Sequence, residues 1–336
     1  MDYNKKGGNE MINIQELTST FLNEVKRKGK RPLEEFDEVL LKQLKALKEG
    51  IEIGDELQYP EVTKELVILP NKGKGEILYS LLIGIVNDDK YSGIILENEF
   101  IVQFYLGVIK TLIGNQKMNM ANITSGAGNL ISKISSELSV NEAYSYELMD
   151  TFVSIQRKIM TITGLNVQVI QKDVIRDGVP ESLVDLTVFS PPFGQRINEE
   201  LDTEQSYLLK GLKKVRDAEL VYLDRAFKMT KSGGYIVTIL PIGLLNKMTA
   251  QPVRDSILDQ AYMKVIINMP MNVFANTGVA TSMLVMQKKE EALQEPKDVI
   301  MADLSTIRLE HKKLNHPSDI NEYNEILRLI SLQGER

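Results

Sequence analysis

The segment that most constrains the fold is an apolar run that stops at two consecutive prolines. Residues 185–194 read DLTVFSPPFG, and the apolar side chains before Ser190 suit a buried strand. Proline has no backbone N–H and a fixed φ, so strand pairing has to end at Pro191 and Pro192. The sequence therefore predicts a central strand that runs directly into a rigid loop.

This loop is rich in hydrogen-bond acceptors. The Ser190 hydroxyl and the carbonyls of Ser190 and Pro191 can accept, Pro192 has no N–H to donate, and Phe193 adds a flat ring. The arrangement suits the binding of an aromatic amine.

Apolar strands and amphipathic helices alternate along the middle of the chain. This alternation predicts an α/β fold with crossover helices and a mostly parallel sheet. We expect seven strands, at residues 118–123, 143–148, 167–173, 185–190, 235–241, 264–270 and 281–289. We expect helices at residues 97–113, 130–138, 149–164 and 207–229.

The two ends of the chain differ from the middle. Apolar residues recur at helical spacing between residues 12 and 53, and the prolines and glycines between 54 and 75 indicate a loop. The charged tail after residue 290 suits a short strand and a terminal helix. We therefore divide the chain into an N-terminal helical region (1–94), an α/β domain (95–290) and a C-terminal extension (291–336).

Composition excludes several kinds of chemistry. The absence of cysteine excludes disulfides, thiolate metal sites and cysteine nucleophiles. The two histidines, His311 and His316, lie in a polar C-terminal stretch, so we expect neither a histidine triad nor a metal site. With no uninterrupted apolar run of about 18 residues and no signal-peptide core, we expect a cytoplasmic protein that does not enter a membrane.

Three expected strand ends carry groups that fit a nucleoside. The turn TSGAGN (124–129) follows the first strand, and its glycines allow a ligand to approach the backbone closely. Glu147 ends the second strand, where an acid can bind both ribose hydroxyls, and Asp173 ends the third, where it can accept from an adenine amine. Alternatively, Glu147 caps the following helix and Asp173 begins a loop.

Taken together, these segments resemble the amino-methylating, S-adenosylmethionine-dependent DNA methyltransferases, whose catalytic pattern is [D/N/S]PP[Y/F/W]. The resemblance covers about residues 95–290 and is closest to methylation subunits of type I restriction-modification systems and their short Gram-positive relatives. The order, glycine turn first and catalytic loop later, is that family's gamma arrangement. Its matching segments here are NITSGAG (122–128), YELMD (146–150), QKD (171–173), SPPFG (190–194), SGGYIVTILPIGLL (232–245) and INMPMNVFANTGVATSMLVMQKK (267–289).

The resemblance implies a Rossmann-like class I methyltransferase fold, S-adenosylmethionine as cofactor and DNA as partner, with a separate specificity subunit or a second copy of the chain as further partners. It implies a catalytic loop of Ser190, Pro191, Pro192 and Phe193. The cofactor-binding residues that it implies are Asn122, Thr124, Gly126, Gly128, Asn129, Glu147, Leu148, Asp173 and Val174.

The sequence departs from the family pattern at two places. Asn122 and Ile123 replace the acid and the proline of the first motif, and Ser190 is the form more usual among cytosine-N4 enzymes. We favour methylation of adenine N6, with cytosine N4 open. Two alternatives are methylation of RNA or of a protein amide, and a degenerate methyltransferase fold that serves as a binding or scaffold subunit.

Overall fold

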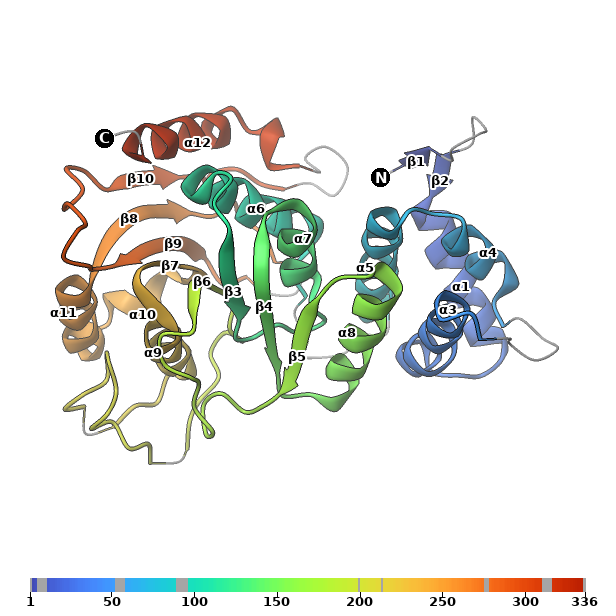
Figure 1. Cartoon of the computed structure of the whole chain (residues 1–336), viewed down its shortest axis with the longest axis horizontal. Coiled ribbons are helices and arrows are strands. Elements are labelled where there is room, and N and C mark those ends of the chain that lie inside the picture. Colours follow the sequence, from blue (N-terminus) through green and yellow to red (C-terminus); the bar gives the residue numbers. More distant parts are fainter. Residues whose placement is uncertain are drawn as a thin grey trace.

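The computed structural model describes residues 2–4, 11–51, 58–88, 96–198, 200–212, 214–274, 278–309 and 316–334. A sheet flanked by helices occupies the middle, and the N-terminal helices pack at one end (Figure 1). His311 and residues 275–277 of the expected late turn lie outside the described residues.

The described part of the chain forms one large sheet of eight strands, with the order β10-β8-β9-β7-β6-β3-β4-β5. Only β9 is antiparallel to its neighbours. The strands are β3 (Met118–Asn122), β4 (Val140–Glu147), β5 (Val167–Gln171), β6 (Val184–Phe189), β7 (Thr230–Pro241), β8 (Ala261–Asn268), β9 (Thr281–Lys288) and β10 (Ile300–Asp303). A separate pair joins β1 (Asp2–Asn4) to β2 (Met11–Asn13).

The α/β architecture is confirmed, but the predicted count of seven strands is wrong. All seven expected strands are present, and the eighth is β10, the short strand of the C-terminal tail. It pairs in parallel with β8. Strand β10 has only four residues, and no tight turn links it to β8. The sequence therefore gives no local signal that β10 joins the sheet, and it did not reveal this pairing.

Helices cover both faces of the sheet. The longer ones are α6 (Glu99–Ile113), α7 (Asn129–Glu137), α8 (Asp150–Thr163), α9 (Ala218–Met229), α11 (Gln251–Gln260) and α12 (Asn321–Gly334). One core joins α6, α7 and α12 to one sheet face, and a second joins α9 and α11 to the other. In Figure 1, α12 lies beside β10 and α6, which it contacts.

The N-terminal region is helical, as predicted, but it contains less loop than expected. Its elements are α1 (Ile14–Arg27), α2 (Pro32–Glu34), the π-helical turn η1 (Glu35–Leu41), α3 (Lys42–Lys48), α4 (Pro60–Val67) and α5 (Asn71–Asp88). The predicted loop at 54–75 is wrong for α4 and the start of α5. Pro60 is the first residue of α4, a position where proline favours a helix because no N–H is needed there.

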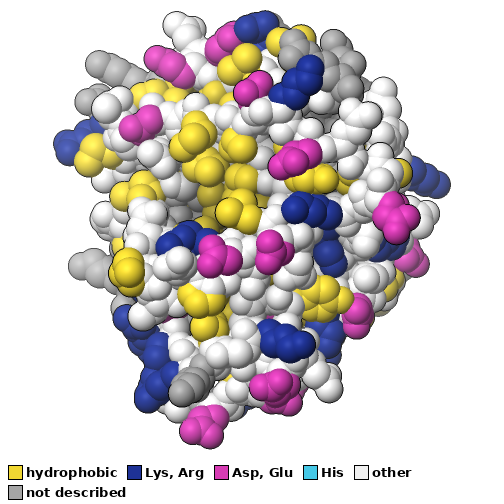
Figure 2. Space-filling view, turned by 90° about the vertical axis from the view of Figure 1, so that its left-hand side faces the viewer, with side chains coloured by type: hydrophobic (Ala, Val, Ile, Leu, Met, Phe, Trp, Pro, Cys, Tyr) yellow, Lys and Arg dark blue, Asp and Glu magenta, His cyan; other side chains and the backbone are white. Residues whose placement is uncertain are grey.

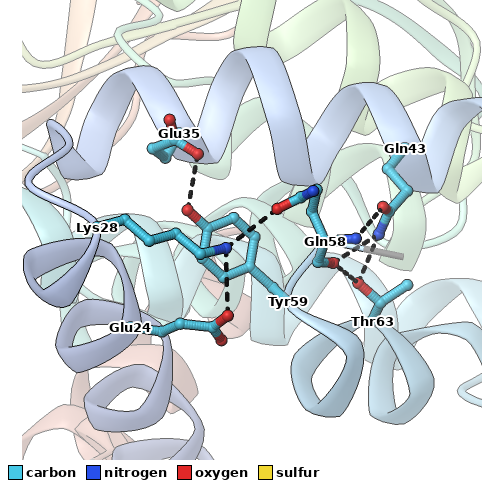
Figure 3. Close-up of polar contacts among 7 residues, drawn as sticks. All are labelled: Glu24, Lys28, Glu35, Gln43, Gln58, Tyr59 and Thr63. Carbon is cyan, nitrogen blue, oxygen red and sulfur yellow. Dashed lines mark hydrogen bonds and ion pairs between the residues drawn. The ribbon is translucent and has the colours of Figure 1, made fainter. Parts of the chain in front are cut away.

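Tyr59 connects the N-terminal helices (Figure 3). Its φ of 51° turns the chain sharply into α4, and its hydroxyl donates to the Glu35 carboxylate at 2.7 Å. The Lys28 ammonium lies 4.2 Å from the centre of the Tyr59 ring and donates to the side chain of Gln58 at 3.0 Å. These contacts hold α1, η1 and α4 together around a buried ring.

The predicted helix at 207–229 begins only at Ala218. The preceding segment bonds to distant groups instead. The Leu208 N–H donates to the Asp224 carboxylate at 2.8 Å, and the Arg216 carbonyl accepts from the Ile197 N–H at 2.9 Å. Tertiary hydrogen bonds therefore replace helical ones in this segment.

Strand β10 is an edge of the sheet, and apolar side chains remain exposed along it. Met301 of β10 is 73% exposed, and its sheet neighbour Ile266 is half-buried. Figure 2, a view of this end of the molecule, shows hydrophobic side chains gathered on the surface. Among the described residues, no helix is both long and apolar enough to span a membrane.

Candidate active site

A cavity of about 350 Å³ opens at the carboxyl ends of β3, β4 and β6. The strand order reverses between β3 and β6, and ligands of open α/β sheets bind at such a switch point. Ten residues predicted for the site line the cavity: Thr124, Gly126, Glu147, Leu148, Asp173, Val174, Ser190, Pro191, Pro192 and Phe193. Segments separated by up to about 70 residues in the sequence thus meet in one place.

The glycine turn between β3 and α7 forms one wall. Gly126 has a φ of 54°, and a side chain built on it would meet only Leu96, at 3.7 Å. The Thr124 hydroxyl is buried and has no hydrogen-bond partner among the described residues. This wall therefore offers open space at Gly126, with the unpartnered Thr124 hydroxyl shielded from solvent.

Gln156 of α8 supports the turn from behind. Its side-chain amide donates to the Gly126 carbonyl at 2.6 Å and to the Ser125 hydroxyl at 2.9 Å. At Gly128, with a φ of 86°, an added Cβ would lie 2.8 Å from Gln156, so only glycine fits. Sequence reasoning missed Gln156, whose one signal is a glutamine on the apolar face of a helix.

Glu147 ends β4 and joins two backbone segments. One carboxylate oxygen accepts from the Gly126 N–H and the other from the Met149 N–H, each at 2.8 Å. Met149 precedes α8, so Glu147 caps that helix and lines the cavity at once. Burial raises the pKa of Glu147, while the N–H groups of Met149 and Gly126 act in the opposite direction.

Asp173 lies two residues beyond the end of β5. Its carboxylate accepts from the Ile175 N–H at 3.0 Å and from the Arg176 N–H at 3.2 Å, which shapes the turn after the strand. It lines the cavity beside Tyr222, whose pKa is raised to about 12 by burial and by nearby Asp173. Asp173 thus begins the loop after β5, as one alternative predicted, and it also lines the cavity, while its acceptance from an adenine amine stays a prediction.

The catalytic-loop candidates follow β6 directly. Tyr105 of α6 donates its hydroxyl proton to the Phe189 carbonyl at 2.8 Å and lies 3.0 Å from the Ser190 hydroxyl. A tyrosine has one such proton, so Ser190 is the donor in the second contact. Both lone pairs of Ser190 are then left to accept from a ligand.

The aromatic ring of the loop is held by a second ring. Phe193 meets Phe274 edge to face, with ring centres 5.1 Å apart and planes at 87°. The Gly194 N–H donates to the Glu219 carboxylate at 2.6 Å, which anchors the end of the loop to α9. Both Phe193 and Phe274 line the cavity, so a flat ligand can lie against them.

Glu97 is a buried acid in this cavity that sequence reasoning missed. It is 4% exposed, and burial raises its pKa to about 7, with a further contribution from the charge of Glu147. Its carbonyl accepts from the side chain of Asn129. A glutamate at the start of a strongly apolar segment was the only available signal.

Three predicted cofactor residues do not line the cavity. Asn122 is buried at the end of β3, where its side chain accepts from the Thr124 N–H at 3.1 Å. Gly128 packs against Gln156, and Asn129 begins α7. These three residues shape the glycine turn behind the wall, and their part in cofactor binding stays a prediction.

Some of the basic residues form ion pairs with acids of the protein itself. Arg196 and Lys247 both pair with Asp217, at 2.7 and 2.9 Å. Farther away, in the N-terminal run of basic residues, Lys26 pairs with Asp88 at 2.6 Å and Arg31 with Glu34 at 3.0 Å. These four basic side chains are therefore paired with acids of the protein itself.

Comparison with solved structures identifies the class of the fold. A protein of Listeria monocytogenes assigned to the class I S-adenosylmethionine-dependent methyltransferases aligns with 95% of this chain and 98% of its own, with a TM-score of 0.73 and 16% identity. A type I restriction-modification methyltransferase subunit of Streptococcus thermophilus aligns with 95% and 74%, with a TM-score of 0.65 and 16% identity. The chain therefore has the α/β methyltransferase fold.

The family follows from the sequence itself. Residues 127–330, more than half of the chain, match the family model described as N-6 DNA Methylase. The chain belongs to this family. The match extends past residue 290 and includes β10 and most of α12. A search among curated proteins gave no match.

Proposed function

We propose that the protein transfers a methyl group from S-adenosylmethionine to an exocyclic amino group of a DNA base, with adenine N6 as the favoured target. One observation carries the proposal: the Ser190–Phe193 loop shares a single cavity with Glu147 and Asp173. A group that accepts from an amine thus lies beside groups that fit a nucleoside. Family membership supports the same activity.

The residues present fit the cofactor. The open space at Gly126 suits the amino-acid end of the cofactor. Each carboxylate oxygen of Glu147 carries one N–H bond and retains a lone pair for a ribose hydroxyl. Asp173 can accept from the adenine amine, and the carboxylates of Glu147 and Asp173 favour a cation in the cavity. The cofactor supplies an electrophilic methyl group on a sulfonium.

The loop positions the amine. The nitrogen lone pair of an exocyclic base amine is delocalised into the ring, so the nitrogen is a poor nucleophile. Ser190 and the Pro191 carbonyl accept the two amine hydrogens, which favours a pyramidal nitrogen whose lone pair points at the methyl group. Phe193 stacks on a base turned out of the duplex, and Phe274 supports that ring.

The choice of base rests on the family. A serine at position 190 serves adenine and cytosine equally well, because it only accepts from an amine. The family description, N-6 DNA Methylase, supports adenine. We also propose that a separate specificity subunit selects the DNA sequence, which the restriction-modification relative supports.

Methyl transfer from labelled S-adenosylmethionine to DNA, RNA and protein tests the proposal. We expect label in DNA, recovered as N6-methyladenine after digestion to nucleosides. Label in N4-methylcytosine would refute the choice of adenine, and label only in RNA or protein would refute DNA as substrate. Cofactor binding without any transfer, in the presence of a cognate specificity subunit, would favour the scaffold alternative.

A further inference from the structure

A second cavity, of about 320 Å³, lies between α5, α6, α7 and the end of α8. It shares no lining residue with the candidate active site. Asn129 lies between the two, because it lines the second cavity while its side-chain amide donates to the carbonyl of Glu97 in the first. The second cavity is within the size range of small-molecule sites.

Two polar atoms on the residues that line this cavity lack partners. Asn129 is 5% exposed, and its Oδ1 has no hydrogen-bond partner among the described residues. The same holds for the Ser135 hydroxyl, one turn and a half farther along α7. The Asn129 amide nitrogen donates to the Glu97 carbonyl, so the atom of Asn129 that lacks a partner is its oxygen, an acceptor. Both atoms are shielded from solvent within the wall, so they do not themselves open onto the cavity.

The four charged residues that line the cavity balance in number, but Glu99 alone among them has no ion-pair partner among the described residues. Both lysines that line the cavity are neutralised: Lys133 pairs with Glu76 at 2.6 Å, and Lys72 pairs with Glu137 at 2.7 Å. Glu99 accepts from Gln103 at 2.6 Å but has no cation within 4 Å among the described residues. Burial raises the pKa of Glu99, so an ammonium beside it would stabilise its charged form.

The rest of the wall is apolar and suits an alkyl chain. Ile83 of α5, Val102 of α6 and Leu165 after α8 all contribute to it. From the carboxylate of Glu99, which has no ion-pair partner among the described residues, and from this apolar wall, we propose that the cavity binds a small organic amine in its protonated form. The ammonium is held by Glu99, and the chain lies against the apolar side. The proposal goes beyond methyl transfer and does not depend on it.

Calorimetric titration of the full chain with 1,5-diaminopentane, without cofactor, tests the proposal. We expect saturable binding of one molecule, and no binding of 1,5-pentanediol, which has the same length without the charge. Glu99→Gln should weaken binding about tenfold or more, because a hydrogen bond to a charged group contributes about 1.5 to 3 kcal/mol. Glu61→Gln, an exposed acid on α4, should leave binding unchanged.

A second variant guards against misfolding. Ser135→Leu places a larger side chain in the cavity. Because leucine is a good helix former, helix α7 should keep its structure. The variant should therefore abolish binding while thermal unfolding stays cooperative. The proposal is overturned if the wild type shows no saturable binding, if the diol binds equally, or if Glu99→Gln or Ser135→Leu binds the diamine as tightly as the wild type.

Discussion

The Tyr105 hydroxyl lies 3.0 Å from the Ser190 hydroxyl and donates its own proton to the Phe189 carbonyl. This relationship fixes the direction of the hydrogen bond between the two side chains, because Ser190 has to supply the proton. Ser190 therefore faces the cavity as an acceptor. Burial raises the pKa of Tyr105, which keeps the hydroxyl protonated for this purpose.

Replacing Tyr105 by Phe should slow methyl transfer without weakening cofactor binding. The variant frees the Ser190 hydroxyl to rotate, and we expect turnover to fall about tenfold, as the loss of a hydrogen bond of about 1 to 1.5 kcal/mol would give. Tyr323→Phe is the matched control, since that hydroxyl also contacts α6 carbonyls but lies away from the loop. Unchanged turnover in Tyr105→Phe would show that Ser190 does not need this orientation.

Phe193 should matter for the base and not for the cofactor. Stacking on an aromatic ring contributes about 1 to 3 kcal/mol per base, so Phe193→Ala should lower kcat/KM for DNA by about tenfold to a hundredfold. Phe193→Tyr, which keeps the ring, should retain most of the activity. Calorimetry should show the same cofactor affinity in all three proteins, and a matching loss of cofactor affinity in Phe193→Ala would contradict the stacking role.

Glu147→Gln should weaken cofactor binding about tenfold or more. The amide nitrogen would face one of the two N–H groups that the carboxylate now accepts from, so the glycine turn would lose a contact as well as a ribose ligand. Glu142→Gln, on the same strand but exposed, is the control. Equal cofactor affinity in the two variants would show that Glu147 does not bind the cofactor.

Glu97 should make stability depend on pH. Its pKa is raised to about 7 in the folded protein, so between its ordinary value of about 4.5 and 7 the folded state holds a proton that the unfolded state has released. The stability due to this proton is complete below about pH 4.5 and is lost as the pH rises to about 7. Glutamine does not titrate, so Glu97→Gln does not show this loss of stability as the pH rises.

Urea unfolding of both proteins between pH 5 and pH 8 measures this effect. The difference between the free energies of unfolding of Glu97→Gln and of the wild type should shift in favour of the variant as the pH rises, by up to about 3 kcal/mol. Parallel pH profiles would mean that Glu97 titrates normally.

Much of the sheet could be predicted because each strand is a local apolar run bounded by turn residues, as at residues 185–194. What the sequence concealed depends on distant partners. The β10 strand is defined by β8, and the segment before Ala218 is held by Asp224 and Ile197 instead of by a helix. Pro60 begins a helix that a count of prolines would assign to a loop.

The residues of the candidate site also divide into those that the sequence predicts and those that depend on distant partners. Residues at the carboxyl ends of strands, such as Glu147 and Ser190, could be placed from the order of strands and turns, since the carboxyl ends of neighbouring parallel strands meet. Tyr105, Gln156 and Glu97 reach the site only through tertiary packing, and each looks like an ordinary helix residue or helix flank in the sequence.

Calorimetric titration of the protein with S-adenosylmethionine tests whether the cavity binds a methyl donor. We predict saturable binding of one molecule per chain, weakened in Glu147→Gln and unchanged in Glu142→Gln. The absence of detectable binding to the wild-type protein would contradict the assignment of this cavity as a methyl-donor site.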